Sequence, residues 1–199
     1  MVPNVNQNKF GKVLLAIART SIADALQIDA AKAVTIDTTA QWLTKPGATF
    51  VTLTQQHQLR GCIGSIQARQ SLLENVRGNA VAAALYDQRF SPVSARELVS
   101  INVEISLLSA LQPLTFVNEK DALSQLRPGI DGVMLTWGAY RSTFLPQVWG
   151  SLPQPCEFLA RLKVKAGLDA VFWDDAIRLS RYTVQKWRET DFVEERNDG

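Results

Sequence analysis

The sequence predicts an α+β fold with largely antiparallel sheets and flanking helices. Segments with helical spacing alternate with short segments rich in β-branched residues. Two pairs of these short segments are separated by only a few residues, a connection that suits antiparallel neighbours. The order strand–turn–strand–helix–strand occurs twice, which suggests a degenerate duplication of a ββαβ unit. We therefore expect a single domain over residues 1–199, with a larger and a smaller lobe and a ligand-binding cleft between them.

The first half of the chain begins with a helix. Apolar residues recur at helical spacing over 8–26, which is typical of an amphipathic helix. Residues 48–54 (ATFVTLT) are β-branched and aromatic and predict a strand, and 59–66 (LRGCIGSI) predict the returning strand of a hairpin. A capping box of the form S-x-x-E then opens a helix over 71–86, because its serine and glutamate satisfy amide groups that a helix start leaves free.

A strand completes the first ββαβ unit, and the second unit follows it. Residues 101–107 alternate strictly between apolar and polar side chains, so they predict a strand with one buried face. Proline and glycine mark the ends of the elements that follow. The predicted elements are a helix over 117–126, strands over 131–136 and 140–145, a helix over 157–167 and a strand over 177–184.

Composition excludes several classes of protein. Of 199 residues, 46% are hydrophobic and 20% are charged, which excludes a disordered, collagen-like or coiled-coil chain. No apolar run approaches the roughly 20 residues of a membrane-spanning helix. The net charge of +2 is scattered, unlike the basic stripe of a dedicated nucleic-acid binder, although a local basic patch is compatible with it.

Cysteine content and the chain ends bear on location. The two cysteines are far apart and match neither a disulfide framework nor a zinc site, so we predict no metal and no cofactor. The first ten residues lack the pattern of a signal peptide, which favours the cytoplasm. We expect 1–7 and 192–199 to be mobile.

Cys62 is the leading candidate for a catalytic residue. It follows Arg60 by two positions on a predicted strand, so both side chains should share a face, and a guanidinium beside a thiol favours the nucleophilic thiolate. Gly61 and Gly64 flank it, and glycine in a strand indicates a bulge or the close approach of another backbone or a ligand. The alternative is a small apolar residue buried in a sheet. His57, the single histidine, lies in a turn and is expected to be exposed.

Other charged residues are candidates for the same site. Glu104 lies on the polar side of the alternating strand and is a candidate catalytic acid or base if that side lines the cleft. Asp87 and Arg89 lie in a loop, where they either anchor a substrate or pair with each other to hold the loop. Arg141 occupies in the second repeat the place of Arg60 in the first. Two such arginines facing one cleft form a site for an anion.

The motifs resemble those of the AMMECR domain family, which in bacteria and archaea is similar to protein A of the AmmeMemoRadiSam system. The central match is Leu59-Arg60-Gly61-Cys62-Ile63-Gly64. The similarity covers almost the whole chain, and only the hairpin at 54–58 lacks a glycine that family members often carry. The further matching segments are 50–53 (FVTL), 87–92 (DQRFSP), 103–109 (VEISLLS), 132–133, 144–148 (FLPQV), 165–168 (KAGL) and 181–182.

The resemblance implies an α+β fold with a small lobe beside a larger one, but it implies no particular reaction. It suggests Memo-like and radical SAM proteins as partners, and it is compatible with RNA or a nucleotide as a ligand. The sequence is compatible with two functions. One is an enzyme, or a catalytic component, that binds an anionic or nucleotide-like substrate beside Cys62. The other is a non-catalytic adaptor that presents the LRGCIG strand to a partner protein or RNA.

Overall fold

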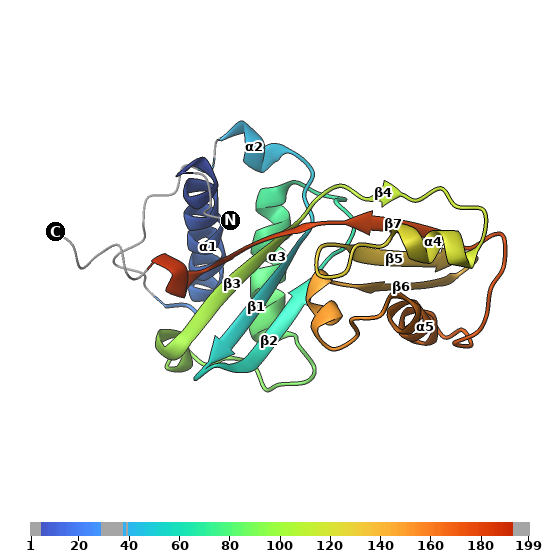
Figure 1. Cartoon of the computed structure of the whole chain (residues 1–199). Coiled ribbons are helices and arrows are strands. Elements are labelled where there is room, and N and C mark those ends of the chain that lie inside the picture. The colour runs from blue at the N-terminus through green and yellow to red at the C-terminus, as the bar shows by residue number, and fades with distance from the viewer. Residues whose placement is uncertain (1–4, 29–37, 39, 193–199) are drawn as a thin grey trace. The chain divides into compact units, whose positions relative to one another are not determined.

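The chain forms two compact units in a computed structural model that describes residues 5–28, 38 and 40–192. Unit 1 takes in the described residues up to Leu108 and from Gln185 onward, and unit 2 is Ser109–Val184. Each unit contains one four-stranded sheet, so the predicted α+β class is confirmed (Figure 1). Within the described residues, no helix is both long and apolar enough to cross a membrane.

Unit 1 is built on a sheet with the strand order β2-β1-β3-β8, which we call sheet 1. β1 is antiparallel to both β2 and β3. The predicted strands over 48–54, 59–66 and 101–107 correspond to the first three strands. The bounds are Thr49–Gln55 for β1, Gln58–Gly64 for β2, Ile101–Leu108 for β3 and Val184–Arg188 for β8.

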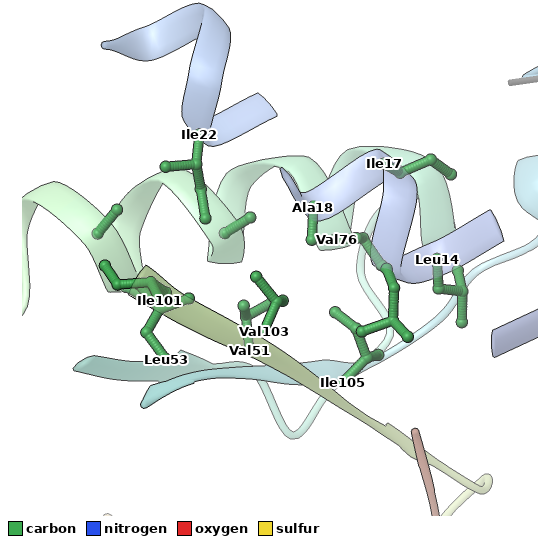
Figure 2. Close-up of a cluster of buried hydrophobic side chains, with 14 of the residues drawn as sticks. Leu14, Ile17, Ala18, Ile22, Val51, Leu53, Val76, Ile101, Val103 and Ile105 are labelled. Carbon is green, nitrogen blue, oxygen red and sulfur yellow. The ribbon is translucent and has the colours of Figure 1, made fainter. Parts of the chain in front are cut away.

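Two long helices cover one face of sheet 1. α1 (Val5–Ala25) and α3 (Leu72–Leu85) pack against each other and against the sheet, and the buried side chains between them form the core of unit 1 (Figure 2). The predicted capping box is present, because the Ser71 side chain accepts from the amide of Glu74 and the Glu74 carboxylate accepts from the amide of Ser71. α2 (Gln41–Thr44) and the 3-10 helices η1 (Glu97–Ser100) and η3 (Glu189–Phe192) complete this unit.

Unit 2 contains a second sheet with the order β4-β7-β5-β6, which we call sheet 2. β5 is antiparallel to β6 and β7, and β4 is antiparallel to β7. Two helices share a core with the apolar residues of β5 and β7. The elements are β4 (Gln112–Pro113), α4 (Glu119–Gln125), β5 (Gly132–Trp137), β6 (Tyr140–Phe144), the 3-10 helix η2 (Pro146–Gly150), α5 (Pro155–Lys165) and β7 (Arg178–Tyr182).

The two units share one topology. β1-β2-α3-β3 and β5-β6-α5-β7 are both ββαβ, and the first strand of each lies between the second and the last. The fourth strand also corresponds, since β8 pairs beside β3 and β4 pairs beside β7. This is the repeated order that the sequence suggests.

Two details differ from the sequence prediction. The strand expected over 177–184 corresponds to β7 in sheet 2, whereas β8 (Val184–Arg188) was not predicted and lies in sheet 1, because the chain changes sheets after Tyr182. Of the ends expected to be mobile, 1–4 and 193–199 lie outside the described residues, whereas α1 already begins at Val5 and Phe192 closes η3.

The β1–β2 hairpin turns through two residues with positive φ angles. Gln55 pairs with Gln58, and the residues between them, Gln56 and His57, have φ angles of 50° and 64°. Two left-handed residues make a type I′ turn, which Asn-Gly adopts with least strain. The hairpin therefore adopts this turn without the glycine that family members often carry, and the absence of that glycine makes the turn more strained.

We expect the double substitution Gln56→Asn/His57→Gly to raise stability by about 1 kcal/mol, because a left-handed conformation costs other residues about that much. Urea denaturation followed by circular dichroism measures the change. As a reciprocal control, Gly138→Ala should lower stability by a similar amount, since Gly138 has a φ of 54° and no neighbour that a methyl group would meet. Equal stability of all three proteins would contradict this account of the turn.

Candidate functional site

One face of sheet 1 is polar and lies away from α1 and α3. Along β1, Val51 and Leu53 are fully buried in the core, so Thr52 between them points to the opposite face. Directly paired residues share a face, which places Cys62 of β2 and Glu104 of β3 beside Thr52. We call this surface the polar face of sheet 1. It carries Thr52, Thr54, Cys62, Asn102 and Glu104.

A bulge in β2 decides that the thiol lies on this face. Leu53 of β1 pairs with Gly61 of β2, and the next residue, Thr54, pairs with Leu59. Arg60 therefore has no partner on β1 and is the extra residue of the bulge. Because side chains alternate with a period of two, one extra residue moves every later side chain to the other face. Without the bulge, Cys62 would lie opposite Val51 and point into the core.

The main chain of Cys62 is held by an aspartate and an arginine from the loop after α3. β2 is an edge strand, so its outward N–H and C=O groups have no strand partner. Asp87 Oδ2 accepts from the Cys62 amide at 2.8 Å, and Arg89 Nη2 donates to the Cys62 carbonyl oxygen at 3.2 Å. The two side chains also bind each other, with Arg89 Nε and Nη2 at 2.9 and 2.7 Å from the carboxylate. They act as a substitute for the missing strand.

Asp87 and Arg89 form a charged pair with one buried and one exposed member. The Asp87 side chain is only 5% exposed, whereas that of Arg89 is 56% exposed. Hydrogen bonds from Arg89 hold the pKa of Asp87 far below its usual range, more strongly than burial raises it. The pKa of Arg89 is raised in turn, chiefly by its hydrogen bonds to Asp87. Arg89 is therefore the cation that binds the main chain of Cys62.

The thiol also contacts a hydroxyl. Cys62 Sγ and Thr52 Oγ1 are 3.3 Å apart, and either can donate. Glu104 lies in the same row beyond Thr52, two strands and about 10 Å from Cys62. Its carboxylate is occupied, since Oε1 pairs with Lys186 Nζ at 2.9 Å and Oε2 with Arg188 Nε at 2.6 Å. The structure thus brings both predicted catalytic residues to one face, but it places Thr52 between them.

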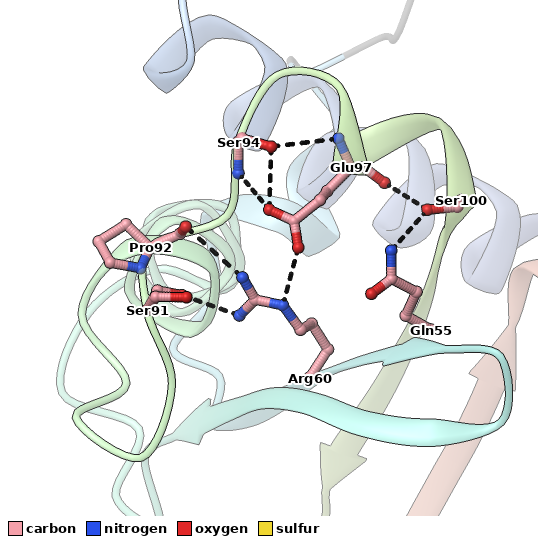
Figure 3. Close-up of polar contacts among 7 residues, drawn as sticks. All are labelled: Gln55, Arg60, Ser91, Pro92, Ser94, Glu97 and Ser100. Carbon is pink, nitrogen blue, oxygen red and sulfur yellow. Dashed lines mark hydrogen bonds and ion pairs between the residues drawn. The ribbon is translucent and has the colours of Figure 1, made fainter.

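Arg60 holds the loop that follows α3 (Figure 3). Its Nε donates to Glu97 Oε1 at 3.2 Å and its Nη1 to the Ser91 carbonyl at 2.9 Å, and its Nη2 is 3.5 Å from the Pro92 carbonyl. The prediction that Arg60 lies beside the thiol depended on regular alternation, and the bulge at Arg60 interrupts that alternation. The substrate-binding role predicted for Arg60 stays a prediction, and it competes with these three contacts.

The two glycines of the motif are explained by packing. A Cβ atom on Gly61 would lie 2.2 Å from the Ala83 carbonyl oxygen of α3, and one on Gly64 would lie 2.3 Å from the Phe50 ring. Gly61 therefore marks the close approach of another backbone, one of the two explanations that the sequence allowed. A contact of either glycine with a substrate stays a prediction.

Arg141 belongs to unit 2 and Arg60 to unit 1, so their joint use in one anion site also stays a prediction. On β6, Arg141 pairs with Thr136, which pairs on its other side with Arg178 of β7. The two arginines thus straddle one threonine on the same face of sheet 2. Neither makes an ion pair with any residue that the structure describes.

The remaining sulfur and nitrogen donors do not gather around Cys62. His57 is exposed in the hairpin turn, as expected, and Cys156 is exposed on α5. Among residues 5–28, 38 and 40–192, no group of three or more histidine, cysteine, aspartate or glutamate side chains is placed to hold a metal ion.

Sequence reasoning did not identify three residues that contact the predicted catalytic residues. Thr52 contacts the thiol, but a threonine in a strand carries no signal until the strand register is known. Arg188 and Lys186 bind Glu104 from β8, a strand that the sequence analysis did not predict. The one available signal was the alternation of cations at 186 and 188 after a strand.

Comparisons with known proteins find similar sequences over most of the chain. The sequence matches the AMMECR1 family over residues 15–187. A protein of Methanothermobacter thermautotrophicus is 35% identical over 183 residues, which is 90% of this chain and 94% of the relative. A protein of Thermotoga maritima is 37% identical over 141 residues, covering 70% and 76%.

A solved structure shows the same fold. The crystal structure of the uncharacterized protein PH0010 from Pyrococcus horikoshii superposes with a TM-score of 0.78 at 29% identity, and the match covers 91% of this chain and 92% of that one. The family match includes the LRGCIG strand, the loop that holds it and the strand of Glu104. On the strength of the family match and these relatives, the chain belongs to the AMMECR1 family.

Proposed function

We propose that this protein is an enzyme, or the catalytic component of one, that binds an anionic substrate on the polar face of sheet 1 and uses Cys62 as a nucleophile. The observation that carries the proposal is the grip of Asp87 and Arg89 on the Cys62 main chain. It fixes the backbone of Cys62 and holds an exposed guanidinium against the Cys62 carbonyl oxygen, and a cation near a thiol favours the thiolate, which is the reactive form. A nucleotide-like molecule is the substrate class that we favour.

Each residue of the site has a distinct role in this proposal. Arg89 stabilises the thiolate and attracts an anionic substrate, because its side chain remains largely exposed while it binds Asp87. Thr52 orients the sulfur through its hydroxyl. Proton transfer by Glu104 requires one of its two ion pairs to open, because both carboxylate oxygens are occupied.

A specific observation favours the alternative of a non-catalytic adaptor. The charged groups of Asp87, Arg60 and Glu104 are all used in contacts within unit 1. Neither of the two carboxylates, those of Asp87 and Glu104, is therefore free to act as a general base. In that case the site is a rigid surface for a partner. The Memo-like and radical SAM proteins, or RNA, are then the partners to test, and the cytoplasm is the compartment that we propose in both cases.

The rate of thiol alkylation separates the two functions. In a Cys156→Ser background, we expect Cys62 of the folded protein to react faster with anionic iodoacetate, relative to neutral iodoacetamide, than a free thiol does. Arg89→Gln should reduce this preference about three- to tenfold, because it removes the charge that attracts the anion. Arg89→Lys keeps the charge and should retain most of the preference.

The matched control is Arg161→Gln, which removes an exposed arginine of α5 in unit 2 and should leave both rates unchanged. If Cys62 reacts only after the protein unfolds, the thiol is structural and the adaptor function takes precedence. The same conclusion follows if Arg89→Gln leaves the ratio of the two rates as it is in the parent protein.

A further inference from the structure

The polar face of sheet 1 continues into a hollow of about 420 Å³. The hollow lies at the end of the face near the β1–β2 turn, and all of its lining residues belong to unit 1. Its volume lies within the range of small-molecule sites, which is roughly 300 to 1,000 Å³. The residues that line it are Thr54, His57, Asn102, Val103, Glu104, Arg188 and Thr190.

Four polar side chains of the hollow are free to bind a ligand. Thr54 and Asn102 are a directly paired couple on β1 and β3, His57 comes from the turn and Thr190 from η3. None of the four makes a side-chain hydrogen bond to any residue that the structure describes. Hydroxyl, amide and imidazole groups that converge on one hollow are typical of a site that recognises a polar ligand.

The charges around the hollow favour an anion. Glu104 is the one carboxylate in its lining, and it is paired with two cations, Lys186 and Arg188. Arg188 uses only its Nε for this ion pair, and its side chain is 55% exposed. The N–H groups of its two terminal nitrogens bond to no described residue. A guanidinium with this free edge can bind two oxygens of a phosphate at once.

The backbone segment 188–190, which forms one wall of the hollow, is held by contacts outside the hollow. Glu189, between Arg188 and Thr190, accepts from the Val103 amide at 2.8 Å and forms an ion pair with Arg19 of α1. The Arg188 amide also donates to Asp191 at 2.9 Å. These contacts fix the backbone of the wall, so the guanidinium is positioned before a ligand arrives and less conformational entropy is lost on binding.

His57 supports a functional reading of the hollow. It holds a left-handed conformation in the hairpin turn, which costs stability that a glycine at this position would restore. Strained residues of this kind are found most often at binding and catalytic sites. Here the strained residue places the only histidine of the chain at the hollow.

We propose that this hollow binds the phosphate group of a small organic phosphate, with the free edge of Arg188 as the main recognition element and His57, Thr54 and Thr190 as further hydrogen-bonding groups. The proposal deepens the proposed function, because the hollow shares Glu104 with the row that leads through Thr52 to Cys62. A molecule of nucleotide length spans the roughly 10 Å between Glu104 and Cys62. Binding itself does not require a reactive thiol.

Nuclear magnetic resonance of the single histidine tests the proposal directly. The full chain without a histidine tag gives one set of imidazole ring signals. We expect adenosine monophosphate and inorganic phosphate to shift these signals in a saturable way, whereas adenosine, which lacks the phosphate, does not shift them. The Cys156→Ser variant should bind as the parent protein does, and the shift is read without any reaction of Cys62, so a failure of the thiol chemistry leaves this result readable.

Arg188→Gln should weaken the binding of adenosine monophosphate about tenfold, and Arg188→Lys should weaken it less, because lysine keeps the charge but loses the planar fork. Arg161→Gln is the matched control and should bind like the parent. His57→Gly, measured by calorimetry, should weaken binding while it raises stability, so its effect cannot arise from unfolding.

Three results would overturn the proposal. One is the absence of a saturable shift with both phosphate probes at millimolar concentration. Another is an equal shift with adenosine, and the third is unchanged affinity in Arg188→Gln. If Cys62 proves reactive while any of these occurs, the proposed function stands and only the phosphate site falls.

Discussion

Substitution of Gly61 by alanine is expected to destabilise unit 1 by about 3 kcal/mol, because overpacking costs typically about 1–3 kcal/mol and contact with a rigid backbone belongs at the upper end of that range. The added Cβ would lie 2.2 Å from the carbonyl oxygen of Ala83, and a backbone atom inside α3 cannot move aside as a flexible side chain can. Relief requires β2 and α3 to separate, which opens the core between them. Urea denaturation followed by circular dichroism measures the loss.

Gly78 of α3 supplies the matched control. It lies on the same helix, it is exposed, and a Cβ there would meet no atom within 4 Å. Gly78→Ala should therefore raise stability by about 1 kcal/mol through helix propensity alone. If Gly61→Ala proves as harmless as Gly78→Ala, then α3 does not pack on β2 as closely as described, and the account of the LRGCIG strand fails.

The elements of the fold follow from local sequence patterns. The strict alternation over 101–107 predicts β3 with its buried face, and the capping box predicts the start of α3. The repeated ββαβ order is also legible, because hairpins and short helices are made by residues close together in the chain. β8 was missed for a related reason, since nothing local shows that a continuous extended segment changes from one sheet to the other.

The position of the thiol depends on one residue that the pattern does not reveal. A two-residue turn at Gln56 and His57 without a bulge would pair Cys62 with Val51 and bury the thiol in the core. The bulge at Arg60 reverses this and assigns Gly61 to the core face, where only glycine fits. The glycine after Arg60 is consistent with a bulge. In a strand without a bulge, the same glycine would instead indicate the close approach of a ligand, so the sequence alone does not distinguish the two cases.

The partners of the site residues come from distant segments. Arg60 and Glu97 are 37 residues apart, and Glu104 and Arg188 are 84 residues apart. Residue types indicate that such charges need partners, but only the folded chain decides which ones meet. The sequence therefore identified Asp87, Arg89 and Cys62 as candidates, and the structure shows that Arg89 binds the Cys62 main chain, whereas Arg60 binds Glu97 and the Ser91 carbonyl.

Substitution of Asp87 by asparagine is expected to lower stability by about 2 kcal/mol at neutral pH, since hydrogen bonds to a charged group contribute roughly 1.5 to 3 kcal/mol. The buried carboxylate accepts from the Cys62 amide, and also from the amide, Nε and Nη2 of Arg89. An asparagine side chain has one carbonyl oxygen and cannot satisfy both partners. Its amide nitrogen would also face a guanidinium, which is a second donor.

The pH dependence of this loss follows from the sign of the pKa shift. The pKa of Asp87 is depressed in the folded protein, so the unfolded chain binds a proton there at a higher pH than the folded chain does. The stabilisation is therefore complete well above about pH 4, the ordinary pKa of aspartate, and is lost progressively as the pH falls below it. The stability difference between the parent protein and Asp87→Asn should narrow accordingly between about pH 6 and pH 3.

Asp175→Asn provides the control, because Asp175 is exposed and makes no bond to a described residue. The stability of this variant should equal that of the parent protein at about pH 6 and at about pH 3. A stability difference for Asp87→Asn that stays constant down to about pH 3 would mean that the carboxylate is not ionised in the fold below its ordinary pKa. Arg89 would then lack the fixed anion that positions it, and the Cys62 site would lose its cation. The same titration thus tests the stability of the edge strand and the electrostatics of the proposed thiol site.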